Sequence, residues 1–143
     1  NPDLIARRIA RWPVGLFASQ DYIDRHGVPE QGSLFEGHDL VVYQPYLQSQ
    51  KDMTLVAEPP GRGRIVAALS SSLLVRRSIA AGIGVGEIPV YTGERDGLVR
   101  LWPERTRPLP YDVWLVTHAD LRHTARVRVV IDEIVAAFAG TGE

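Results

Sequence analysis

The sequence predicts an α/β fold with a mixed, largely parallel sheet flanked by helices. Short apolar runs typical of strands alternate with helix patterns along the chain, which is the arrangement of α/β domains. Near its end the chain has apolar side chains at helical spacing, namely Val127, Val130, Ile131, Ile134, Val135 and Phe138. The 143 residues, 45% of them hydrophobic and 23% charged, suffice for one ordinary domain with a buried core.

The predicted strands are short apolar or amphipathic runs that end at turn residues. In chain order they cover residues 4–11, 14–18, 40–43, 64–69, 83–88, 98–102 and 112–117. The first run fits a helix equally well by its spacing, and Trp12-Pro13 ends it in either case. Residues 45–62 are expected to be irregular, because Pro59-Pro60-Gly61 interrupts regular structure there. The Pro-rich residues 105–110 separate the last two strands.

The predicted helices begin at capping residues and end at glycine. Ser19 is a natural N-cap, and Gly27 closes the helix that it starts. Three serines lead into the second helix, and Gly82 stops it. In chain order the expected helices cover residues 20–26, about 73–81 and the apolar stripe that ends before Gly140, with single turns at 33–36 and 89–92.

Composition excludes several classes of function. Sixteen basic and seventeen acidic residues give a net charge of -1, so the chain lacks the electrostatic footprint of a nucleic-acid-binding domain. The absence of cysteine excludes disulfides, thiolate catalysis and cysteine-based metal sites. Apolar runs of about six residues are too short for a membrane span or a signal peptide. Because the chain begins without Met inside a strand-like pattern, we expect it to be a fragment of a longer protein.

No residue pattern predicts catalysis, a metal site or a cofactor. The glycines of residues 82–86 follow a helix and precede a strand, whereas a nucleotide-binding fingerprint needs the opposite order. They are better explained by a helix end followed by a strand packed close to a neighbour. His118 and His123 lack a nearby acidic third ligand, and no Gly-x-Ser-x-Gly elbow is present. Paired carboxylates, such as those at residues 132–133, are expected on solvated helix faces.

Three consecutive serines, Ser70, Ser71 and Ser72, form the most informative polar cluster. They stand where a predicted parallel strand ends and a helix begins, which is where open α/β sheets bind ligands. A helix N-terminus offers backbone N–H groups without helical acceptors and a partial positive charge, both suited to a carboxylate or phosphate. The alternative is an N-cap with two additional serines, and the local sequence leaves both interpretations open.

Seven stretches form an ordered set along nearly the whole chain. They are DLIARRI (3–9), GLFASQDYI (15–23), LFEGHDLV (34–41), SSSLL (70–74), AAGIGVGEIP (80–89), GLVRL (97–101) and VWLVTHADLR (113–122). This set resembles the effector-binding region of LysR-type transcriptional regulators, without its N-terminal part. The resemblance implies a two-lobed, periplasmic-binding-protein-like (type II) fold with Rossmann-like lobes and a ligand cleft between them.

The resemblance also implies where the lobes and the ligand site lie. Residues 1–13 would be the tail of effector lobe one, residues 14–110 lobe two, and residues 111–143 the return strand and C-terminal helix of lobe one. The family's ligand contacts in lobe two fall on Ser70, Ser71 and Ser72 and on the corner formed by Ile88 and Pro89. The family often has Asn after the first serine, whereas this chain has Ser71.

The chain is therefore expected to be the effector-sensing part of a bacterial, cytoplasmic LysR-type regulator and not an enzyme. It would bind a small, anionic co-inducer without a cofactor or metal, and would contact DNA only through a missing N-terminal helix-turn-helix. The apolar stripe is expected to dock on strands of its own chain or on a second copy, giving a dimer, or a tetramer in the full-length protein. No membrane contact is expected. A solute-binding protein of similar fold is the alternative, and a small α/β enzyme would lack a convincing nucleophile.

Overall fold

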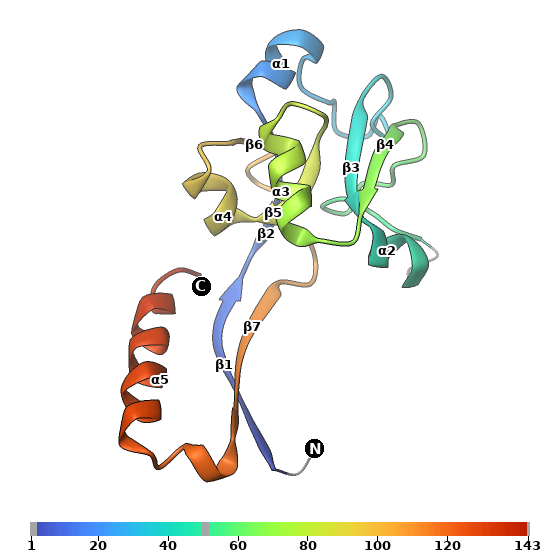
Figure 1. Ribbon diagram of the computed structural model, residues 1–143. Helices are drawn as coiled ribbons and strands as arrows, with labels where there is room; N and C mark the ends of the chain where they lie inside the picture. Colours follow the sequence, from blue (N-terminus) through green and yellow to red (C-terminus); the bar gives the residue numbers. More distant parts are fainter. Residues whose placement is uncertain (1–2, 50–51, 143) are drawn as a thin grey trace. The chain divides into compact units, whose positions relative to one another are not determined.

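The computed structural model describes residues 3–49 and 52–142 and divides the chain into two compact units. Unit 1 combines Asn1–Pro13 with Pro110–Glu143, and unit 2 is the continuous segment Val14–Leu109. In chain order the elements labelled in Figure 1 are β1 (Leu4–Trp12), β2 (Val14–Ala18), α1 (Gln20–His26), β3 (Asp39–Tyr43), α2 (Gln44–Ser49), β4 (Arg64–Leu69), α3 (Ser72–Ala80), β5 (Gly86–Pro89), α4 (Val90–Arg95), β6 (Val99–Leu101), β7 (Tyr111–His118) and α5 (Ala125–Phe138). No helix among the described residues has the length and apolarity to cross a membrane.

The structure confirms a mixed α/β fold and corrects the expectation that its pairing is largely parallel. β2 lies between β5 and β6 and is antiparallel to both, and β1 is antiparallel to β7. β3 and β4 are parallel, and a parallel bridge joins Leu40 to Val85. Alternating apolar runs and helices do not encode strand direction, because a fully buried strand is apolar on both faces whichever way its neighbour runs.

β2 forms the centre of unit 2, because all five of its residues are buried. Successive side chains of a strand point to opposite faces, so β2 contributes to two apolar clusters. Leu16 and Ala18 belong to a cluster that includes Tyr22, Phe35 and residues from β3 and β6. Phe17 belongs to the other cluster, whose remaining buried members are Val41, Val75, Ile79 and Ile88. The second cluster packs α3 onto the sheets.

The glycines of residues 82–86 allow close backbone packing. A Cβ atom on Gly84 would lie 2.7 Å from the carbonyl oxygen of Asp39, and one on Gly86 would lie 2.8 Å from that of Val41. Gly82, just after α3, has a φ of 80°, in the left-handed region that favours glycine. This confirms the expectation of a helix end followed by a strand packed close to a neighbour.

Residues 4–11 form a strand, which is one of the two possibilities that their spacing left open. Other elements differ from the sequence predictions. A short helix, α2, lies in the stretch that was expected to be irregular, and Pro45 occupies its first turn, where a missing N–H group is tolerated. α4 replaces the single turn expected at residues 89–92. The strand expected from residue 83 begins only at Gly86.

Unit 1 consists of the antiparallel pair β1–β7 and helix α5. The rings of Trp12 and Phe138 stack with centroids 5.7 Å apart, and Trp12 Nε1 donates to Thr141 Oγ1 at 2.8 Å. Five residues of the apolar stripe are half-buried, whereas Val130 is 56% exposed. Of the two arrangements expected for the stripe, the structure shows docking on the chain's own strands, with Val130 outside the contact.

Candidate ligand site at the carboxyl ends of the strands

The carboxyl ends of three strands meet at one edge of unit 2. β3 and β4 run parallel, and the parallel bridge between Leu40 and Val85 gives the chain leading into β5 the same direction. The residues that follow Tyr43, Leu69 and Pro89 therefore emerge at this edge. In open α/β sheets this is the edge where ligands bind, because helix N-termini point toward it.

The serine cluster, Ser70 to Ser72, lies at this edge between β4 and α3. Ser71 is the N-cap of α3, and its Oγ accepts a hydrogen bond from the backbone N–H of Leu74 at 3.3 Å. Ser70 and Ser72 are exposed, and the first turn of α3 contains no acidic residue. The cap expected from the sequence is thus present. The other two hydroxyls and the positive end of the helix remain accessible to an anion.

The structure places Ile88 and Pro89 at the end of β5, in different environments. Ile88 is 3% exposed and packs in the cluster that holds α3 on the sheets, together with Val75 and Ile79. Pro89 is half-buried and is the N-cap residue of α4. Pro89 can therefore offer apolar surface to a ligand, while Ile88 supports the position of α3.

Arg107 is a charged group at this edge that sequence reasoning did not assign to a site. Its Nη1 donates to Tyr46 Oη at 2.7 Å, and its guanidinium lies 5.4 Å from the centroid of the tyrosine ring. The Tyr46 ring contacts that of Tyr43 edge-on, with centroids 5.2 Å apart. Tyr43 in turn pairs with Leu69, the residue before Ser70. In the sequence Arg107 is one basic residue of the Pro-rich segment 105–110, and nothing next to it indicates a contact with Tyr46.

Glu87 is the acidic group of the same region. Its Oε2 accepts the backbone N–H of Val56 at 2.8 Å. Burial raises the pKa of the Glu87 carboxyl, and the bond from Val56 and the positive charge of Arg107 partly offset that rise. A half-buried acid and a half-buried guanidinium therefore influence each other in unit 2.

The histidines do not form a metal site. His118 Nδ1 accepts the backbone N–H of Asp120, and His123 Nε2 accepts from its neighbour Arg122. His38 is buried against Tyr22, with Tyr22 Oη 2.8 Å from His38 Nδ1. Across the described parts of the chain, no group of three His, Cys, Asp or Glu side chains is arranged to hold a metal ion.

The family model that matches this chain is described as the LysR substrate binding domain, and it matches residues 1–139. The match therefore includes segments of both units. A search of curated protein sequences gives no match.

Several solved structures share the fold. The chain is similar to the regulatory domain of CrgA, a LysR-type transcriptional regulator from Neisseria meningitidis, with a TM-score of 0.75 and 21% identity over 97% of this chain and 71% of that one. In a structure of CrgA itself, the match covers 98% of this chain and 49% of the CrgA chain. The regulatory domain of AphB from Vibrio vulnificus is 26% identical, with a TM-score of 0.59 over 95% of this chain and 71% of that one.

Proposed function

Because this chain belongs to the LysR substrate-binding domain family, we propose that it is the effector-sensing domain of a bacterial transcriptional regulator. The family match over residues 1–139 is the observation that carries the proposal. The effector would favour one arrangement of the regulator over another, and so change how its DNA-binding part holds an operator. In this role the chain recognises its ligand without transforming it and uses neither cofactor nor metal.

Two lobes would share this task. Unit 2 corresponds in this proposal to effector lobe two, residues 14–110, and unit 1 combines the lobe-one segments 1–13 and 111–143. The division of the chain at residues 13/14 and 109/110 supports this assignment, since each boundary lies within one residue of the proposed one.

The ligand would be a small organic anion bound at the serine cluster. The N-terminus of α3 provides backbone N–H groups and a partial positive charge, and the exposed hydroxyls of Ser70 and Ser72 add donors. Pro89 would contact the apolar part of the ligand, with Ile88 packed beneath. The positive charge of Arg107 at the same strand edge favours an anion over a cation. Arg107 contacts Tyr46, the Tyr46 ring contacts that of Tyr43, and Tyr43 pairs with Leu69, the residue before the serine cluster.

The partners follow from the family. The regulator would act in the cytoplasm as a dimer or tetramer and would contact DNA through an N-terminal helix-turn-helix domain. A solute-binding protein of similar fold is the rival proposal. The family match favours the regulator, and so does the likeness to regulatory domains of CrgA and AphB.

The test replaces Ser70 and Ser71 by Ala in the complete regulator. A charge-assisted hydrogen bond contributes about 1.5–3 kcal/mol, so loss of these donors should weaken binding of small carboxylates about tenfold or more by calorimetry. The carboxylate concentration that is needed to alter operator binding should rise by the same factor. Since Ser71 is also a helix cap, Ser19→Ala is the matched control: it removes the cap bond to Tyr22 on α1 instead. Equal carboxylate affinity in the double variant and in this control would refute the site.

A further inference from the structure

Arg107 is a half-buried arginine that forms no ion pair with a carboxylate among the described residues. Two other half-buried arginines do have such partners. Arg76 Nη2 lies 3.0 Å from Asp96 Oδ1. Arg105 Nη1 lies 3.3 Å from Glu58 Oε1. Removing a charge from water without a partner is unfavourable, so the guanidinium of Arg107 is suited to an anionic ligand.

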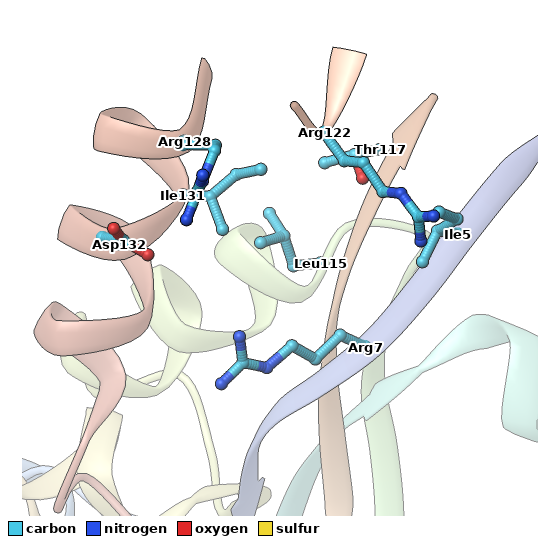
Figure 2. A pocket seen from close by; sticks show the side chains of 8 residues that line it. All are labelled: Ile5, Arg7, Leu115, Thr117, Arg122, Arg128, Ile131 and Asp132. Carbon is cyan, nitrogen blue, oxygen red and sulfur yellow. The ribbon is translucent and has the colours of Figure 1, made fainter. Parts of the chain in front are cut away.

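The arginines of unit 1 lie in a different environment. Figure 2 shows Arg7, Arg122 and Arg128 around a pocket that is lined by residues of β1, β7 and α5. All three are exposed, so water hydrates their charges and an ion pair there would contribute little. Arg107 belongs instead to unit 2, which is one continuous segment of the chain.

Two hydrogen bonds and an aromatic ring fix the guanidinium of Arg107. Its Nε donates to the carbonyl oxygen of Leu109 at 2.6 Å, and its Nη1 donates to Tyr46 Oη at 2.7 Å. The guanidinium carbon lies 5.4 Å from the centroid of the Tyr46 ring. The backbone N–H of Arg107 donates to the carbonyl oxygen of Val14 at 2.8 Å, which holds the residue itself. A guanidinium has five N–H groups, so those of Nη2 remain to bind a carboxylate.

This guanidinium lies near the serine cluster along the same strand edge. Tyr43 ends β3 and pairs with Leu69, the residue before the serine cluster, and its ring contacts that of Tyr46. Figure 1 shows α2 and the start of α3 at the same end of unit 2. Arg107 also acts electrostatically on Glu87 of β5. Neighbouring strands are about 4.8 Å apart, so the guanidinium lies one to two strand spacings, or about 5–10 Å, from the end of β4.

We propose that the effector is a dicarboxylate, with one carboxylate bound at the serine cluster and the other at Arg107. This inference rests on the proposed function, because it adds a second anchor to the site at the N-terminus of α3. The second carboxylate would accept hydrogen bonds from Nη2 of Arg107, whose orientation Tyr46 fixes. Pro89, at the end of β5, would contact the short aliphatic chain between the two carboxylates.

Glu87 is the group that opposes an anion at Arg107. Burial raises the pKa of its carboxyl, which favours the neutral form and leaves the charge of Arg107 for a ligand. In Glu87→Gln the negative charge is absent, and the amide oxygen can still accept the backbone N–H of Val56. This variant should therefore bind dicarboxylates more tightly. Weaker dicarboxylate binding than in the exposed control Glu94→Gln would count against the proposal.

The class of ligand is tested with matched pairs of carboxylates. Adipate and hexanoate have the same chain length and differ only in that a carboxylate replaces a methyl group. Succinate with butanoate, glutarate with pentanoate, and pimelate with heptanoate complete the series. In calorimetry on the complete regulator, the dicarboxylate of at least one pair should bind tenfold or more tightly than its monocarboxylate. Equal affinities within every pair would overturn the proposal.

Variants of the second anchor test its residues. Arg107→Gln should reduce the preference for the dicarboxylate to less than about threefold. Tyr46→Phe should reduce it several-fold, because it removes the oxygen that accepts from Nη1. Arg95 and Tyr91 on α4 provide the matched controls, since Arg95 Nη1 donates to Tyr91 Oη at 3.0 Å and its guanidinium lies 5.5 Å from that ring. Arg95→Gln and Tyr91→Phe should keep the preference, and the same loss in all four variants would refute the role of Arg107.

A purely structural role of Arg107 would give a different result. If its guanidinium only holds the connection at residues 105–110, or pairs with a carboxylate elsewhere in the complete regulator, Arg107→Gln should weaken both classes of ligand equally or neither. Either outcome would overturn the proposal.

The two anchors can also fail separately. Replacing Ser70 and Ser71 by Ala should weaken monocarboxylates and dicarboxylates alike, because both use the serine cluster. If monocarboxylates depend on these serines while no dicarboxylate is preferred, the second anchor is refuted and the serine site stands. If no carboxylate of the series binds, both are refuted.

Discussion

Tyr22 Oη and His38 Nδ1 lie 2.8 Å apart inside unit 2. The same tyrosine oxygen accepts the backbone N–H of Asp39 at 3.1 Å, so its own proton can be donated to His38 Nδ1. That arrangement requires a neutral imidazole with its proton on Nε2. Burial lowers the pKa of His38, and the nearby His26 lowers it further, against an opposing effect of Asp39.

This histidine should make unit 2 sensitive to acid. The unfolded chain has an ordinary histidine pKa of about 6.5, and the folded pKa lies below it. At pH values between the folded and the unfolded pKa of His38, the unfolded chain binds more protons than the folded chain does. The free energy of unfolding therefore falls as pH drops below about 6.5. Urea unfolding between pH 7.5 and 5 measures this slope. His38→Gln should flatten it, whereas a slope unchanged from that of the exposed control His123→Gln would contradict the assignment.

Glu87 should act in the opposite direction at lower pH. Burial raises its folded pKa above the ordinary value, so the folded chain takes up a proton before the unfolded chain does. The contribution of this group to the free energy of unfolding therefore rises as pH falls through the folded pKa. Glu87→Gln should increase the urea midpoint at pH 7 and remove this rise, because an amide oxygen can still accept from Val56. Glu94→Gln, on an exposed position of α4, serves as control; a lower midpoint in Glu87→Gln than in this control would count against the argument.

Glu58 connects three segments of unit 2. Its Oε2 accepts the backbone N–H groups of Gly32 and Leu34 at 2.8 and 3.0 Å, and its Oε1 lies 3.3 Å from Arg105 Nη1. Because the glutamate is buried, Glu58→Ala leaves these donors unpaired and should lower the free energy of unfolding by about 3 kcal/mol. Glu36→Ala, which removes an exposed ion pair, should change it by less than about 0.5 kcal/mol. Similar urea midpoints for the two variants would refute this difference.

The stacking of Phe138 on Trp12 should hold the end of α5 in place. Phe138→Ala removes a half-buried ring and should lower the free energy of unfolding of unit 1 by about 2 kcal/mol. This is somewhat less than the loss caused by truncating a fully buried phenylalanine. Hydrogen exchange across residues 125–138 should accelerate accordingly. Val130→Ala, at an exposed position on the same helix, should leave the exchange unchanged. Slow exchange of α5 in both variants would mean that other contacts hold the helix.

The sequence predicted the elements whose signals are local. Ser19 caps α1 as expected, since its Oγ accepts the backbone N–H of Tyr22 at 3.0 Å. The spacing of the apolar stripe predicted α5, and the half-buried face of that helix follows it except at Val130. Capping and helical periodicity act within a few residues, so they can be recognised without knowledge of the rest of the fold.

Features that depend on distant contacts could not be predicted. Val56 and Ala57 have φ values of 41° and 68° between the bridged residues Leu55 and Glu58, a turn in which Asn and Gly are usual. A bond to Glu87, thirty-one positions away, helps to hold this turn. The contact of Arg107 with Tyr46 likewise joins segments that nothing in the local sequence links. The serine cluster was recognised as a candidate because a strand and a helix adjoin it directly in the chain.

The central claim, that a small anion binds at the N-terminus of α3, is tested most directly by changing only the charge of the cap. Asp and Asn both serve as N-caps, so Ser71→Asp and Ser71→Asn should preserve α3, which thermal unfolding can verify. Calorimetric titration of the complete regulator with the carboxylate that alters its DNA binding should give an affinity within about threefold of the original for Ser71→Asn. Repulsion between like charges should weaken binding about tenfold or more in Ser71→Asp. Equal carboxylate affinities for the two variants would contradict the claim.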